Sequence, residues 1–162
     1  MRIALQFLLM MGLAIHAAAA TSCSPVPGAD QIWSKSSVHW VFIGELHGSN
    51  ETPAAFGNLV CDAIAHGKHV TVALERPSSK QAALDNVLTV KDLAKAKEEL
   101  LHLPGWKNVL DGRASEAMLR LLVSLRELHR LHPDLKVVAF DAPYTGTAPG
   151  RETKRWDMRC FR

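Results

Sequence analysis

The chain is poor in aromatic residues and carries no strong excess of charge of either sign. Aromatic residues make up 6% of its 162 residues, charged residues make up 22%, and the formal net charge is +3. It has no basic stripe with interleaved aromatic side chains, which argues against a nucleic-acid partner. It also lacks internal repeats and long low-complexity tracts, so its length favours one domain over two.

Cysteine is scarce as well. Cys23, Cys61 and Cys160 are too few and too far apart in the sequence to form a disulfide framework. One disulfide with one remaining thiol is compatible with this count. If Cys23 carries another modification, Cys61 and Cys160 are the only candidate pair.

The longest apolar run lies at the N-terminus and is typical of an export signal. It extends over Ile3–Ile15 behind a basic second residue, and four alanines at 17–20 provide the small residues that a signal peptidase requires. The run is shorter than the ~20 residues of a transmembrane helix. We therefore predict a signal peptide over 1–20, a tether over 21–37, and an exported protein that is periplasmic or secreted. An alternative is a lipid-modified N-terminus at Cys23, which would be its only attachment to a membrane.

Residues 38–150 show the alternating strand and helix signals of an α/β domain. Short runs of β-branched and aromatic residues predict strands, and longer runs with apolar residues at helical spacing predict helices between them. This order predicts a three-layer, open, mainly parallel sheet flanked by helices. Residues 151–162 show no convincing period and are predicted to form an irregular basic tail. The expected strands are Val38–Ile43, Val70–Leu74 and Val137–Phe140, and the expected helices are 52–66, 79–88, 90–102 and 115–131, with Thr52 as the first N-cap and Gly67 ending the first helix.

Each predicted strand is followed by a polar side chain. Glu45 and His47 follow the first strand, Glu75 follows the second, and Asp141 follows the third. The carboxyl ends of parallel strands meet at one edge of a sheet, where open α/β folds bind their ligands. We therefore expect these four side chains to converge. Carboxylates and an imidazole together can hold a divalent metal or activate water as general bases.

Each of these residues also has a purely structural explanation. His47 could hydrogen-bond to the start of the following helix, Glu75 could be an ion-pair partner in a turn, and Asp141 could cap a turn. Arg113 lies just before a predicted helix. It could extend into the cleft as a clamp for an anion or a carbonyl, or it could pair with Asp111 and fix the loop.

Taken together, these elements resemble the superfamily that joins erythromycin esterases, ChaN-like haem-binding lipoproteins and Tiki-type metalloproteases. The resemblance covers about Val38 to Asp141 and implies a central sheet with a cleft formed by Glu45, His47 and Glu75. Esterase relatives use such residues to activate water, Tiki-type relatives use them around a divalent metal, and ChaN-like relatives bind haem. The Glu-x-His spacing is one residue shorter than the usual esterase form, which favours the Tiki/ChaN branch. The segments that carry the resemblance are Gly44-Glu45-Leu46-His47-Gly48, Ala73-Leu74-Glu75, Asp111-Gly112-Arg113 and Phe140-Asp141.

One departure from the family pattern concerns the C-terminus. Relatives continue to a further strand carrying Gly-Asn-x-His, which brings a second histidine to the cleft, whereas this sequence ends in the stretch 151–162. We therefore expect a domain that is incomplete at its C-terminus. Such a domain would expose an edge strand, through which two chains could form a homodimer.

The leading hypothesis is an exported α/β domain whose Glu/His site supports metal- or water-assisted hydrolysis of the esterase or peptidase type. His47 would be the general base or a metal ligand, Glu45 and Glu75 would orient it or bind the metal, and Arg113 and Asp141 would support the cleft. The alternative is a non-catalytic module that binds haem or iron through His47 and Tyr144. A third hypothesis is an inactive truncated fragment.

Overall fold

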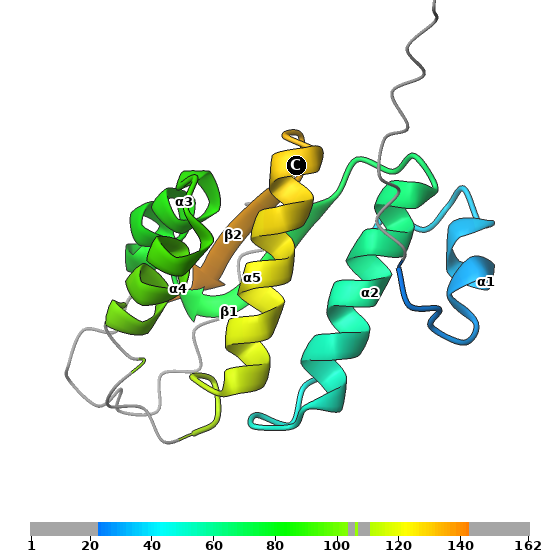
Figure 1. The fold of residues 1–162 in the computed structure, drawn as a ribbon. Coiled ribbons are helices and arrows are strands. Elements are labelled where there is room, and N and C mark those ends of the chain that lie inside the picture. The colour runs from blue at the N-terminus through cyan, green and yellow to red at the C-terminus, as the bar shows by residue number, and fades with distance from the viewer. Residues whose placement is uncertain (1–22, 104–105, 107–110, 143–162) are drawn as a thin grey trace, which may run out of the picture.

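The protein combines helices with a small parallel sheet and is an α/β chain (Figure 1). A computed structural model describes residues 23–103, 106 and 111–142. Its elements, in chain order, are α1 (Ala29–Trp33), α2 (Glu51–Ala65), β1 (Thr71–Pro77), a 3₁₀ turn (Ser78–Lys80), α3 (Gln81–Thr89), α4 (Leu93–His102), α5 (Glu116–Leu131) and β2 (Lys136–Asp141).

β1 and β2 pair in parallel and are connected through α3, α4 and α5. The two strands match in register from Thr71 and Lys136 to Leu74 and Ala139. The register then shifts between Leu74 and Pro77, so that Glu75 and Arg76 lie in the irregular end of β1. This irregularity lies at the carboxyl edge, where the sequence predicts the site.

The core lies on one face of this sheet. Alternate residues of β1 are buried or exposed, and the equivalent alternation in β2 buries Val137 and Ala139. Val72, Leu74 and Val137 join one apolar cluster with residues of α2, α3, α4 and α5, and Figure 1 shows α5 lying across the sheet with α2 beside it. The five apolar residues that mark the predicted face of α5 are all buried, as expected from their helical spacing: Met118, Leu121, Leu122, Leu125 and Leu128.

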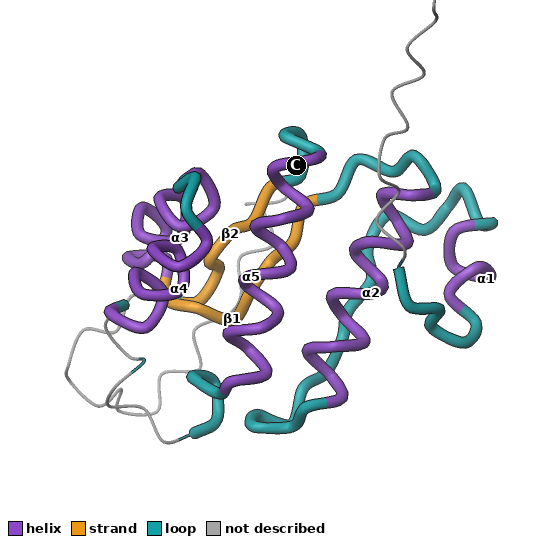
Figure 2. The backbone as a smooth tube through the Cα atoms, in the orientation of Figure 1, coloured by secondary structure: helices purple, strands orange, loops and turns teal. Residues whose placement is uncertain are grey.

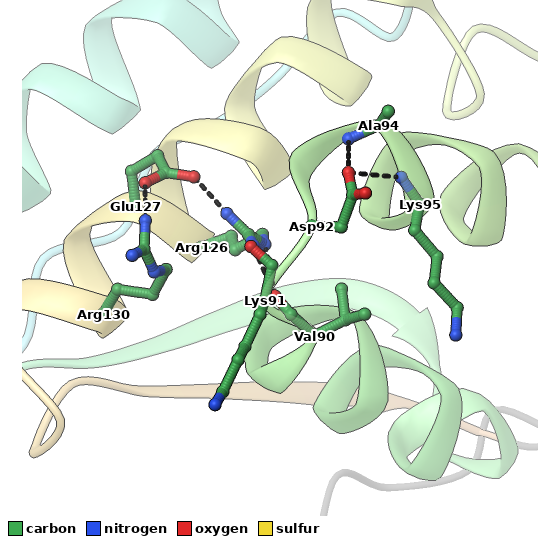
Figure 3. Close-up of polar contacts among 8 residues, drawn as sticks. All are labelled: Val90, Lys91, Asp92, Ala94, Lys95, Arg126, Glu127 and Arg130. Carbon is green, nitrogen blue, oxygen red and sulfur yellow. Dashed lines mark hydrogen bonds and ion pairs between the residues drawn. The ribbon is translucent and has the colours of Figure 1, made fainter.

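A fully buried arginine fixes the end of α3 to α5. Arg126 donates from Nη2 to the carbonyl oxygens of Val90 and Lys91, at 2.7 Å for Lys91, and pairs with Glu127 (Figure 3). The carbonyl of Val90, the C-cap of α3, therefore gains a charged donor. Asp92 then starts α4 by accepting from the amides of Ala94 and Lys95.

The predicted helix boundaries hold within a few residues. Gly67 ends α2 as expected, with a positive φ of 70°, and Ser115 caps α5 by accepting from the amide of Met118 at 3.2 Å. The predicted N-cap of α2 is wrong. Asn50, and not Thr52, precedes the helix, because Glu51 and Thr52 are already helical.

The first predicted strand is not formed. Val38–Ile43 has no assigned secondary structure, and its apolar side chains are exposed. Figure 2 draws it as part of the loop between α1 and α2. The apolar pattern indicated a buried strand, but within the described residues no partner strand lies beside this segment. The expected βαβ unit, in which this strand would precede α2 and β1, is therefore not formed in the described part of the chain.

The N-terminal segment packs against α2. Cys23 forms a disulfide with Cys61 of α2, with 5.6 Å between their Cα atoms, and Trp33 of α1 donates to Asp62 at 2.5 Å. Part of the predicted tether over 21–37 is thus the short helix α1, fixed to the domain. A lipid group would attach to the same sulfur of Cys23, so lipidation there and this disulfide exclude each other.

Three sequence predictions lie outside the described residues. These are the signal peptide over 1–20, Tyr144 as an iron ligand and the basic tail over 151–162. Among the helices that are described, none is both long enough and apolar enough to cross a bilayer.

Candidate functional site

A tight turn places Glu45 and His47 at the carboxyl edge of the sheet. The amide of Ser49 donates to the carbonyl of Leu46 at 3.0 Å, and Gly48 adopts a φ of 88°, a conformation that favours glycine. Asn50 at the start of α2 accepts from Arg120 of α5 at 3.0 Å. The turn is therefore held by the backbone and by α5, although no strand precedes it.

Residues from four separate segments meet at this turn, as the sequence predicts. His47 Nδ1 lies 3.3 Å from Glu45 Oε2, and His47 Nε2 lies 3.8 Å from Glu75 Oε2. Arg113 extends the chain of contacts, because its Nη2 lies 3.4 Å from Glu75 Oε1 and its Nη1 lies 3.6 Å from Asp141 Oδ2. All five predicted site residues that the structure describes thus form one connected group.

The structural explanation considered for Arg113, a pair with Asp111, describes its surroundings. Its Nε lies 3.1 Å from Asp111 Oδ2, and its amide donates to Asp111 Oδ1 at 3.0 Å, so the loop is fixed by a local Arg–Asp contact. The same guanidinium also reaches Glu75 and Asp141 in the cluster. Three carboxylates around one guanidinium offset its positive charge, which weakens its use as an anion clamp.

The loop of Arg113 rests directly on the turn of His47. Gly112 has a φ of 87°, and a Cβ atom added to it would lie 2.4 Å from the amide nitrogen of Gly48 and 2.7 Å from the carbonyl oxygen of His47. Only a glycine permits this approach of two backbones. Gly112 therefore sets the separation between the histidine and the arginine of the site.

Sequence reasoning missed Arg76, which follows Glu75. Its Nη2 donates to the carbonyl of Arg113 at 2.6 Å, and its guanidinium lies over the ring of Trp106, 4.9 Å from the centroid. Burial lowers the pKa of Arg76, and the charge of Glu45 acts in the opposite direction. The available sequence signal was its place beside Glu75 at a predicted strand end.

Several buried polar atoms in and around this cluster lack a hydrogen-bond partner within the described residues. Buried polar groups in proteins are almost always satisfied, by protein, water or ligand. Such atoms can hydrogen-bond to water or to a polar ligand. The atoms are Glu45 Oε1, His47 Nδ1, Ser49 Oγ, Trp106 Nε1 and Arg113 Nε.

The charges of the site are unbalanced toward the negative. The group contains four carboxylates, from Glu45, Glu75, Asp111 and Asp141, against the guanidiniums of Arg76 and Arg113. With a neutral imidazole, the local charge is negative by two units. This field disfavours an anionic ligand and favours a neutral or cationic one.

The cluster does not fit the predicted metal site formed by Glu45, His47 and Glu75. Within the described residues, no three side chains of histidine, cysteine, aspartate or glutamate are arranged so that they could hold a metal ion. Both ring nitrogens of His47 face carboxylates instead.

Comparisons with known proteins add no relative. No protein-family model matches the chain, and no characterised protein or solved structure shows significant similarity to it.

Proposed function

We propose that the Glu45–His47–Glu75 cluster is a hydrolytic site in which His47 acts as a general base on water. The observation that carries this proposal is the position of the imidazole between two carboxylates, 3.3 Å from Glu45 and 3.8 Å from Glu75. A carboxylate that accepts from one ring nitrogen fixes the tautomer and leaves the other nitrogen free to accept a proton.

In this mechanism the Glu45 carboxylate, 3.3 Å from Nδ1 of His47, moves closer to accept the Nδ1 proton, a hydrogen bond that the present geometry does not make. The lone pair on Nε2 then faces the gap toward Glu75. A separation of 3.8 Å is too long for a direct hydrogen bond and leaves room for a bridging water. Transfer of a proton from that water to Nε2 yields an imidazolium, which both carboxylates stabilise, and a hydroxide equivalent that adds to an ester or amide carbonyl. The tetrahedral adduct then collapses with cleavage of the acyl C–O or C–N bond, and the imidazolium returns its proton to the departing alcohol or amine.

Arg113 and Asp141 hold Glu75 in place in this proposal. The guanidinium contacts Glu75 at 3.4 Å and Asp141 at 3.6 Å, so the carboxylate that borders the water is fixed from the side away from His47. The negative excess of the cluster favours a neutral ester or amide, or a cationic one, as the substrate. No step of the mechanism requires a metal, in keeping with the arrangement of the side chains.

We further propose that the chain is an exported member of the erythromycin esterase/ChaN/Tiki superfamily with a three-layer sheet. Three observations support this proposal: the Gly-Glu-x-His-Gly turn, its contact with Asp-Gly-Arg, and the parallel pair β1–β2. The Cys23–Cys61 disulfide supports export, because such bonds persist in oxidising compartments.

The test compares the purified chain without residues 1–20 with two histidine variants. We expect turnover of neutral aryl esters or of peptide amides, and we expect His47→Ala to lower kcat/KM by about 100-fold or more, since general-base catalysis contributes roughly 10²–10⁴. His102→Ala is the matched control, because His102 is exposed at the end of α4 and outside the cluster. It should retain full turnover.

Metal removal provides the second arm. Dialysis against a chelator should leave turnover unchanged if water is activated by His47 alone. Loss of turnover that a divalent cation restores would refute the metal-free mechanism. Equal turnover in His47→Ala and the unmodified protein would refute the site itself.

A further inference from the structure

The segment Val38–Ile43 presents an apolar surface that the described part of the chain does not cover. Phe42 is 88% exposed, and its neighbours Val41 and Ile43 are 39% and 40% exposed. Successive side chains of an extended backbone point to opposite sides, so exposure at all three positions means that both sides of the segment reach solvent. The segment contains no Pro, Lys, Arg, Asp or Glu, the residues with which proteins protect an exposed edge.

Within this segment, the backbone of Val41–Ile43 is also available for pairing, whereas the amide of Val38 donates to the carbonyl of Lys35 at 3.3 Å. Within the described residues, the amides and carbonyls of Val41, Phe42 and Ile43 make no hydrogen bond. The outer edge of β2 differs, because the side chain of Gln81 donates to the carbonyl of Val137 at 3.0 Å and accepts from the amide of Ala139 at 2.7 Å. An incoming strand would have to displace Gln81 from β2, whereas nothing need be displaced at Val41–Ile43.

An open depression lies beside the exposed phenylalanine. Its volume is about 390 Å³, and it lies between α1 and the segment. Among the described residues that line it, Lys35 is the only charged one, and the aliphatic and aromatic side chains of the lining offer contacts to an apolar side chain. The lining residues are Gly28, Gln31, Ile32, Lys35, Val38, Trp40, Val41 and Phe42.

We propose that Val38–Ile43 is the interface of a two-fold symmetric dimer. Two copies of the segment pair side by side, and Phe42 of each copy enters the depression of the other. A two-fold interface uses the same patch on both chains, so that patch must contain both a projecting group and a hollow that receives it. Phe42 and the adjacent depression meet this requirement.

The chemistry of the segment favours a second copy over an unrelated peptide. Identical charged segments repel one another when they pair, but this segment carries no formal charge when His39 is neutral. A stable interface buries about 800 Å² on each partner, more than one short strand supplies. We therefore expect a concentration-dependent dimer with a Kd in the micromolar range.

This inference goes beyond the proposed hydrolysis and does not depend on it. Glu45 and His47 follow the segment in the chain, but neither residue lines the depression. The dimer can therefore be tested on protein that shows no turnover. Loss of turnover in His47→Ala would leave the dimer prediction unaffected.

Sedimentation equilibrium tests the proposal on the chain without residues 1–20, with its disulfide intact. Between about 1 and about 200 µM, we expect the mass to rise from monomer to dimer, as a micromolar Kd requires. Phe42→Lys should remain a monomer over this range. It should also keep its fold, judged by far-ultraviolet circular dichroism, because so exposed a side chain contributes little to the core. The matched control is Leu131→Lys at the end of α5, a leucine that is 55% exposed outside the segment, and this variant should dimerise like the unmodified chain.

Two outcomes would overturn the dimer. One is a monomer at every concentration, and the other is a dimer that Phe42→Lys does not weaken. Hydrogen exchange adds an independent readout, since the amides of Val41–Ile43 should become protected as the concentration rises. Protection that is already complete in the monomer would mean that the same chain covers the segment, and would also refute the proposal.

Discussion

Replacing Gly112 by alanine should separate the two halves of the candidate site. The added Cβ atom would lie 2.4 Å from the amide nitrogen of Gly48 and 2.5 Å from the carbonyl carbon of His47. Both are backbone atoms, so neither contact can be relieved by rotation of a side chain. The loop of Gly112 must therefore move away from the turn by about 1 Å to reach ordinary van der Waals separation.

The magnitude has two parts. A φ of 87° costs a residue with a Cβ atom about 1–2 kcal/mol. Displacement of the loop adds the loss of its contacts, and we expect a total destabilisation of about 2–3 kcal/mol. At roughly 2–4 °C per kcal/mol for a chain of this size, the Tm should fall by about 4–12 °C. Arg113 moves with the loop, and a shift of about 1 Å at a catalytic site can lower kcat/KM about 100-fold.

Gly67→Ala is the matched control for this prediction. Gly67 also has a positive φ, of 70°, but a Cβ atom there would meet nothing within 4 Å. It should therefore show the backbone penalty of about 1–2 kcal/mol without the displacement, and retain full turnover. Thermal unfolding and ester turnover of both variants are the measurements. If Gly112→Ala were no less stable and no less active than Gly67→Ala, the close contact between the two loops would be refuted.

Two further predictions concern buried and exposed charge. Arg126→Leu should lower the free energy of unfolding by about 3 kcal/mol, because the carbonyls beyond α3 lose a buried charged donor. Urea denaturation measures this free energy, and a loss below about 0.5 kcal/mol would contradict the prediction. The hydrogen bond with His69, at 2.9 Å, is the main cause that lowers the pKa of the Asp134 carboxyl. The ionised carboxylate therefore stabilises the folded protein at pH values above the ordinary pKa of an aspartate, and this stabilisation is lost as the pH falls through the lowered pKa of the folded state. His69→Ala should raise this pKa toward its usual range, as measured by NMR titration of the carboxyl carbon, and an unchanged titration would show that another group causes the shift.

Local sequence signals were sufficient for the helices and for the parallel strand pair. The apolar spacing in α5 and the glycine after α2 depend on contacts within a few residues, and both predictions are confirmed. The convergence of Glu75 and Asp141 at one edge was also predictable, because both lie at the carboxyl ends of paired parallel strands, whereas Glu45 reaches the same edge from a turn that no strand precedes.

The first strand could not be decided from local pattern. Val38–Ile43 has high strand propensity, yet a strand forms only when a partner supplies the hydrogen bonds of the ladder. No partner lies beside it within the described residues. The contact roles of Arg76 and Gly112 were missed for a related reason, since they depend on contacts with Arg113 and with the turn of His47, which no sequence period encodes.

The site therefore depends on contacts between loops more than on the sheet. If a paired strand held Glu45 and His47, loss of the loop contact at Gly112 would leave their position almost unchanged. In the observed fold the turn is fixed by Gly112 on one side and by the Arg120–Asn50 contact on the other. Pairing of Val38–Ile43 with a second chain would add the missing constraint directly before Glu45. Dimer formation and turnover should then rise together with concentration if pairing orders the site, and turnover per chain should be constant if the two loop contacts already suffice.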